Sequence, residues 1–112
     1  MTLKEREVQG VVVLELSGKI MGGPEASEFQ HRLHALVDEG KTKVIADLSD
    51  VNWMNSSGVG ILIGGLTTLK SSGGDLKLVG ASGKIESLLI ITKLIKIFDS
   101  FNSLEEAVAS FS

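Results

Sequence analysis

The chain has 112 residues, of which 43% are hydrophobic and 22% charged, which suits one small globular domain and is too short for two ordinary ones. A net charge of −3, 11 scattered Lys and Arg residues and only 4% aromatic residues give no support to nucleic-acid binding. The absence of cysteine excludes a disulfide framework, a thiolate zinc site and a thiol nucleophile.

The first half of the sequence predicts a hairpin, a helix and a central strand. Residues 4–9 are expected to pair across a glycine with the β-branched run 11–16. Residues 24–40 begin with proline, carry apolar residues at helical spacing and finish with glycine, which is typical of an amphipathic helix. Residues 43–48 are nearly continuously apolar after the first, as expected of a parallel strand covered on both faces.

The second half continues this alternation of helices and strands. A helix is predicted over residues 59–69, a strand over 76–79 and a helix over about 82–92. Ile97-Phe98 is expected to begin a last strand, and residues 103–106 form a capping box at the head of a terminal helix. Together with the opening hairpin, this order favours a layered α/β domain with a mixed sheet.

The most informative segment is residues 53–60, Trp-Met-Asn-Ser-Ser-Gly-Val-Gly, between a predicted strand and an apolar helix. A phosphate on Ser56 would lie where a helix offers unpaired N–H groups and the positive end of its dipole. Plain N-capping by Asn55 or Ser56 would explain the same polar residues without any signalling. Local physics leaves both readings open.

Catalytic motifs do not fit this junction. A serine hydrolase elbow needs glycines two residues before and two after the nucleophile, and neither Ser56 nor Ser57 has both. The only histidines, His31 and His34, precede the serines and suit a solvated helix surface, and no motif supplies further metal ligands. Glycine-rich runs at 58–64 and 80–84 miss the spacing of nucleotide-binding loops. We therefore expect no enzyme, no cofactor and no metal.

Three other segments have simple structural interpretations. Trp53 and Met54 are expected to close the core beneath the junction. The turn at residues 21–23 is either a flexible connection or part of the same rim as Ser56. The charged residues 5–7 are expected to solvate an edge strand.

The chain shows no sign of export or membrane insertion. Its first seven residues are charged and lack the apolar stretch of a signal peptide. No later apolar run reaches the roughly 18 to 20 residues of a spanning helix. A soluble, cytoplasmic protein is expected.

Residues 45–49, 51 and 54–62, with supporting similarity from residues 17–20 to residues 103–107, resemble the STAS domain of bacterial anti-sigma factor antagonists. The resemblance implies a single STAS domain over residues 1–112, with a mixed sheet and about four α-helices. It also implies that the unphosphorylated protein binds an anti-sigma factor serine kinase and so releases a sigma factor.

By motif position, the resemblance implies that phosphorylation of Ser56 disables binding and that a serine phosphatase restores it. ATP and magnesium would belong to the kinase. The residues expected to contact the partner are those of the turn at residues 21–23 and those next to Ser56: Met21, Gly22, Gly23, Met54, Asn55, Ser57 and Gly58.

Two positions depart from the family pattern. Asn55 stands where the family often has Asp before the phosphoacceptor, and Met21 stands where a second Asp is common. Asn can cap and hydrogen-bond but carries no charge. The alternative is a STAS module that is not phosphorylated and serves as a scaffold or assembly subunit of another signalling or transport complex.

Overall fold

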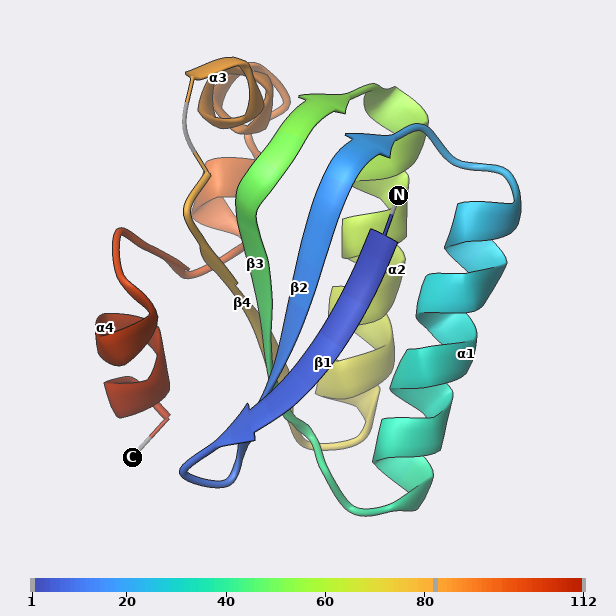
Figure 1. Cartoon of the computed structure of the whole chain (residues 1–112), viewed down its shortest axis with the longest axis vertical. Coiled ribbons are helices and arrows are strands. Elements are labelled where there is room, and N and C mark those ends of the chain that lie inside the picture. Colours follow the sequence, from blue (N-terminus) through green and yellow to red (C-terminus); the bar gives the residue numbers. More distant parts are fainter. Residues whose placement is uncertain (1, 82, 112) are drawn as a thin grey trace.

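In the computed structural model, which describes residues 2–81 and 83–111, the chain opens with the predicted β-hairpin (Figure 1). Strands β1 (Thr2–Val8) and β2 (Val11–Ile20) pair antiparallel. Gln9 and Gly10, which join them, have φ angles of 51° and 80°. Such left-handed pairs match the twist of a two-residue hairpin, so the turn sets the register of the first two strands.

The sheet then continues with parallel strands. β3 (Lys43–Met54) pairs with β2, β4 (Asp75–Val79) with β3, and β5 (Ser100–Phe101) with β4, giving the spatial order β1-β2-β3-β4-β5. The predicted mixed sheet is confirmed.

Helices cover both faces of this sheet. The long helices α1 (Pro24–Asp38) and α2 (Ser56–Ser71) pack against each other on one face, whereas α4 (Leu104–Ala109) lies on the opposite face (Figure 1). Helix α3 (Gly83–Ile91) lies beside the end of β3 and leads into the 3₁₀ helix η1 (Leu94–Lys96). Ser82, expected to start α3, lies outside the described residues.

Two hydrophobic cores lie on either side of the sheet. Val44 and Ala46 of β3 belong to the larger core beneath α1 and α2, and Ile45 between them belongs to the smaller core beneath α4. Successive strand residues point to opposite faces, so a strand covered on both must be apolar throughout. The prediction that residues 43–48 form a central strand covered on both faces is confirmed.

Strand β1 is charged along its length and forms one edge of the sheet. Glu5 forms a bidentate pair with Arg32 of α1, in which Nη2 donates to Oε2 at 2.6 Å. On the opposite face of the strand, Nε of Arg6 lies 2.8 Å from a carboxylate oxygen of Glu15. The edge therefore presents paired charges, as expected of a strand that faces solvent and does not pair with a further strand.

Two local predictions are wrong. The last strand is Ser100–Phe101, while Ile97 is an exposed residue just after η1 and Phe98 is buried in the larger core. The apolar pair at 97–98 therefore anchors a turn rather than a strand. Trp53 was expected in the core with Met54, but Trp53 is 42% exposed and only Met54 is buried.

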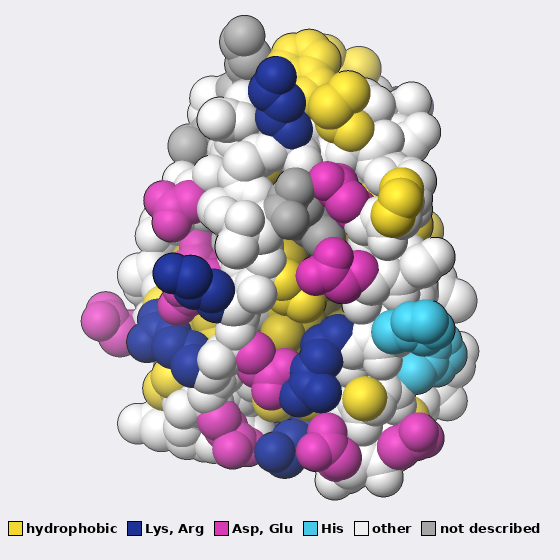
Figure 2. Space-filling view, turned by 45° about the vertical axis from the view of Figure 1, so that its right-hand side comes forward, with side chains coloured by type: hydrophobic (Ala, Val, Ile, Leu, Met, Phe, Trp, Pro, Cys, Tyr) yellow, Lys and Arg dark blue, Asp and Glu magenta, His cyan; other side chains and the backbone are white. Residues whose placement is uncertain are grey.

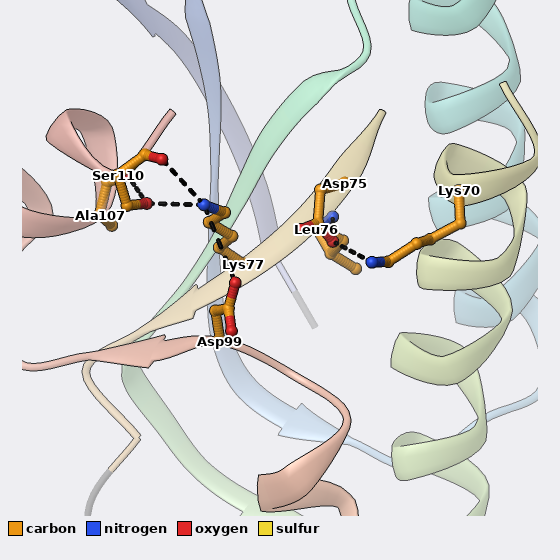
Figure 3. Close-up of polar contacts among 7 residues, drawn as sticks. All are labelled: Lys70, Asp75, Leu76, Lys77, Asp99, Ala107 and Ser110. Carbon is orange, nitrogen blue, oxygen red and sulfur yellow. Dashed lines mark hydrogen bonds and ion pairs between the residues drawn. The ribbon is translucent and has the colours of Figure 1, made fainter. Parts of the chain in front are cut away.

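A buried lysine fixes α4 to the sheet (Figure 3). Lys77 of β4 is 8% exposed, and its Nζ donates to the Ser110 carbonyl at 3.2 Å and to the Ser110 hydroxyl oxygen at 2.8 Å. The same Nζ lies 4.3 Å from the centre of the Phe111 ring and 3.8 Å from a carboxylate oxygen of Asp99. Lys77 thus satisfies its charge through the end of α4 and the segment before β5.

Candidate functional site

The start of α2 is built around a capping asparagine. Asn55 has the extended backbone of an N-cap residue, and its Oδ1 accepts a hydrogen bond from the Gly58 backbone N–H at 2.9 Å. Of the two capping candidates, Asn55 is therefore the one that caps. Ser56 is the first residue of the helix, and its side chain is exposed, as is that of Ser57.

Close backbone packing fixes the position of this helix start. A Cβ added to Gly58 would lie 2.2 Å from the Ile20 carbonyl oxygen and 2.8 Å from Cγ of Met54. The backbone N–H of Asn55 also donates to the Ile20 carbonyl, at 3.4 Å. The first turn of α2 therefore rests directly on the end of β2, which only glycine at position 58 permits.

The turn between β2 and α1 lies against the same helix start. Gly22 and Gly23 have φ angles of 91° and 70°, and a Cβ on Gly22 would approach Cβ of Ser57 to 2.9 Å. Nδ2 of Asn55 donates to the Met21 carbonyl at 3.5 Å. The turn thus contacts both neighbours of Ser56, which agrees with the interpretation that it is part of the same rim as Ser56. We call residues 21–23 and 55–57 the serine rim.

The predicted partner-binding residues differ in their exposure. Met21 is 50% exposed and Asn55 is half-buried, whereas Met54 and Gly58 are buried beneath the serine rim. Met54 and Gly58 shape the surface from below, and contact of the rim with a partner remains a prediction.

The electrostatics of the rim suit an added negative charge. The first turn of α2 contains no acidic residue, so the positive end of its dipole is not offset by a carboxylate of that turn. The nearby Glu25 accepts a hydrogen bond from the Met21 backbone N–H at 3.2 Å. Phosphate oxygens on Ser56 would be acceptors placed where a helix presents donors.

Metal binding finds no support among the described residues. No group of three or more His, Cys, Asp or Glu side chains in residues 2–81 and 83–111 could hold a metal ion. His31 and His34 are exposed on α1, and Figure 2 shows the histidine side chains together on the molecular surface. In the same part of the chain, no helix has the length and apolar character needed to cross a bilayer.

Two features of the site escaped the sequence analysis. The first is the hydrogen bond from Asn55 to Met21, which joins residues 34 positions apart and which no local sequence pattern predicts. The second is the exposure of Trp53, because the apolar composition of the segment does not distinguish it from its buried neighbour Met54.

Comparison with known proteins points to one family. The STAS domain model matches residues 3–107. A putative anti-sigma factor antagonist, BtrV of Bordetella bronchiseptica, is 26% identical over 111 residues, covering 99% of this chain and 95% of that protein.

Solved structures show the same fold. The crystal structure of a putative anti-sigma factor antagonist from Thermotoga maritima has a TM-score of 0.86 at 27% identity, covering 96% of this chain and 92% of that one. The Bacillus cell fate determinant SpoIIAA in its phosphorylated form has a TM-score of 0.75 at 19% identity, covering 99% of this chain and 100% of that one.

Proposed function

This chain belongs to the STAS domain family, and from that premise we propose that it is an anti-sigma factor antagonist controlled by phosphorylation of Ser56. Its unphosphorylated form binds an anti-sigma factor serine kinase, so that a sigma factor is released. The relatives from Bordetella bronchiseptica and Thermotoga maritima, both named putative anti-sigma factor antagonists, support the antagonist role. The observation that carries the proposal is the exposed Ser56 at the first position of α2, beside the turn at residues 21–23.

The chemistry in this proposal belongs to the partners. The kinase brings ATP and magnesium and transfers the phosphoryl group to the Ser56 hydroxyl, and a serine phosphatase removes it. This chain supplies a surface and an acceptor, so it acts as a binding protein without a catalytic site or a cofactor of its own. Such a cycle takes place in the cytoplasm, where ATP is available.

Geometry favours Ser56 over Ser57 as the acceptor. Asn55 already provides the cap, so the Ser56 hydroxyl is not required for that role. The Cβ of Ser57 lies against Gly22, so a phosphate on Ser57 would be closer to the turn between β2 and α1. Ser56 can carry the group without rearrangement of the serine rim.

The expected effect of the phosphate is on binding more than on folding. It adds about −1.5 to −2 charges at neutral pH. At the N-terminus of α2 this charge meets a favourable dipole, whereas a partner surface pressed against the rim must accept it at close range. The same modification is therefore tolerated by the domain and adverse to the complex.

A phosphorylation assay tests the proposal directly. The purified anti-sigma factor kinases of the native organism are incubated with this chain and ATP, and the modified residue is mapped by mass spectrometry. Ser56→Ala should abolish labelling and keep kinase binding, Ser56→Asp should weaken binding, and Ser57→Ala is the matched control. Labelling at another residue, or equal affinity of Ser56→Asp and wild type, would contradict the proposal.

The uncharged rim favours a second candidate, a constitutive scaffold or assembly subunit. Asn55 and Met21 bring no carboxylate to the positions beside Ser56, so this surface differs from the acidic one that the family often has. A partner complex that is unaffected by kinase, ATP and the Ser56→Asp change would identify the scaffold. A complex that dissociates on phosphorylation would exclude it.

A further inference from the structure

An open groove lies beside the serine rim, between the end of β3 and helix α3. Its volume is about 570 Å³, enough to receive apolar side chains of another molecule. Two strand residues and four helix residues line it: Trp53, Met54, Gly83, Ser87, Leu88 and Ile91. We call it the α3 groove. Figure 1 shows α3 at the same end of the molecule as the start of α2.

Helix α3 is apolar on more sides than its own core requires. Ile85 and Leu89 are buried against the sheet, which already anchors the helix. Ile91, at its end and on the groove, is nevertheless 77% exposed, and Trp53 across the groove is 42% exposed. Figure 2 shows hydrophobic side chains gathered at this end of the molecule. An exposed apolar patch of this kind typically marks an interaction surface.

The groove is continuous with the serine rim. Met54 lines the groove, and the next two residues are the capping Asn55 and the proposed acceptor Ser56. A protein that covers Ser56 would therefore extend over the groove with little additional reach. This continuity identifies the occupant as part of the same partner.

Charge indicates the chemistry of that partner. Lys93 and Lys96 follow helix α3 and are exposed, against one exposed glutamate of the helix, Glu86, in a chain whose net charge is −3. Lys19, which is exposed, lies opposite Trp53 in the pairing of β2 with β3. A second copy of this chain would bring the same lysines to the groove, which like-charge repulsion disfavours.

We propose that the α3 groove docks an apolar segment with acidic flanking residues on the anti-sigma factor kinase, and that Trp53 and Ile91 are its main contacts. The proposal rests on the proposed function, because it assigns a second contact to the same partner. The groove gives affinity and partner choice, and the serine rim gives phosphorylation control.

Paired substitutions separate the groove from the switch. Ile91→Ser should raise the dissociation constant for the unphosphorylated complex about tenfold or more, as expected for an apolar anchor at a protein interface. Ile63→Ser is the matched control, because Ile63 is an exposed isoleucine on α2 that does not line the groove. Its affinity should stay within about twofold of wild type. Circular dichroism of both variants verifies that the fold is kept.

The outcomes distinguish the two proposals. If no kinase binds or phosphorylates the wild-type chain, the proposed function fails and the docking proposal fails with it. If the kinase binds wild type and phosphorylates Ser56, but Ile91→Ser and Ile63→Ser bind equally well, only the groove proposal is overturned.

Trp53 offers an independent reporter because it is the only tryptophan of the chain. In protein labelled with 5-fluorotryptophan, a single ¹⁹F resonance should shift or broaden when unlabelled kinase is added. A resonance whose chemical shift and linewidth stay unchanged at saturating kinase would overturn the docking proposal. A resonance that moves with the concentration of this chain alone would instead identify a second copy as the occupant.

Discussion

The side-chain amide of Asn55 donates from Nδ2 to the Met21 carbonyl across 3.5 Å, while its Oδ1 caps α2 through the Gly58 N–H at 2.9 Å. One neutral side chain thus ties the turn after β2 to the start of α2. An aspartate could accept the capping bond but has no proton to donate to a carbonyl when ionised. The neutral residue therefore has a structural role that an ionised aspartate could not fill.

Asn55→Asp and Asn55→Ala should differ in a defined way. The Asp variant keeps the cap and adds a favourable charge at the helix start, so its free energy of unfolding should change by less than about 0.5 kcal/mol. The Ala variant loses the cap and should be destabilised by about 0.5–2 kcal/mol. Urea denaturation measures both. Amide hydrogen exchange should be faster at residues 21–23 in both variants, and unchanged exchange there would argue against the Asn55–Met21 bond.

Two glycines of α2 should respond to alanine in opposite directions. Gly58→Ala places a Cβ against the Ile20 carbonyl, so it should destabilise the protein by about 1–3 kcal/mol. Gly60→Ala meets nothing within 4 Å and should stabilise it by about 0.5–1 kcal/mol through better helix propensity. Thermal unfolding of the pair checks this. A tolerated Gly58→Ala would mean that α2 can move away from β2 without loss.

The ion pair between Glu5 and Arg32 should make stability depend on acid pH. The hydrogen bond from Arg32 holds the pKa of Glu5 below its ordinary value of 4.5, even though partial burial opposes the shift. Because the folded pKa is lowered, the pair stabilises the fold above the unfolded pKa, and that contribution is lost as pH falls through the folded value. Wild type should exceed Glu5→Gln by less than about 1 kcal/mol near neutral pH, since the pair is partly exposed.

Denaturation curves from pH 7 to pH 2 test this expectation. The two stability curves should run parallel above the unfolded pKa of the glutamate and converge below it. Added salt should reduce the difference at neutral pH, because exposed ion pairs are screened. A difference that grows on acidification would contradict the assigned direction of the shift.

The anchoring of α4 through Lys77 can be divided into its polar and apolar parts. Lys77→Met keeps most of the buried stem but loses the bonds to Ser110, so it should loosen α4 at a cost of about 1–2 kcal/mol. Lys77→Ala also leaves a cavity and should cost more. Lys70→Ala is the control, since its pair with Asp75 spans 3.8 Å and lies at the surface, so it should change stability by less than about 0.5 kcal/mol.

Hydrogen exchange of the α4 amides gives the readout for this series. Exchange should accelerate in Lys77→Met more than in Lys70→Ala, because only Lys77 touches the end of that helix. Equal protection of α4 in all three proteins would show that the apolar contacts of Ala107 and Val108 hold it without the lysine.

The order of the elements was predictable from local patterns, because each one carries its own signal. For residues 43–48 the signal is the nearly continuous apolar run of a central strand. For the last helix it is the predicted capping box, in which the Ser103 hydroxyl accepts from the Glu106 N–H at 3.2 Å. The extension of β3 to Met54 was not predictable. The three residue steps of β3 from Asp47 to Asp50 lie opposite only two residue steps of β2. Further along, the two residue steps from Val51 to Trp53 lie opposite only one residue step of β2.

Each of these irregularities adds a residue to β3 and reverses the side to which later residues point. The two reversals cancel at Trp53, which points to the same side of the sheet as Ile45 and is nevertheless 42% exposed. Between them, Val51 is buried in the larger core and departs from the alternation set by Val44 and Ala46, so burial along this segment could not be predicted from alternation alone. Lys77 escaped prediction for a different reason. Its partners Ser110 and Phe111 lie more than 30 positions away, and only the packed fold brings them together.

The charges of β1 have a consequence for how many sheets can join. Along this strand the residues facing α1 are Glu5 and Glu7, and those on the other face are Lys4 and Arg6. If two copies aligned their edges antiparallel about a twofold axis, residues from the same face would meet, so glutamates would oppose glutamates and cations would oppose cations. The charges of this strand therefore oppose the joining of two sheets through their first strands, which protects an otherwise free edge from association.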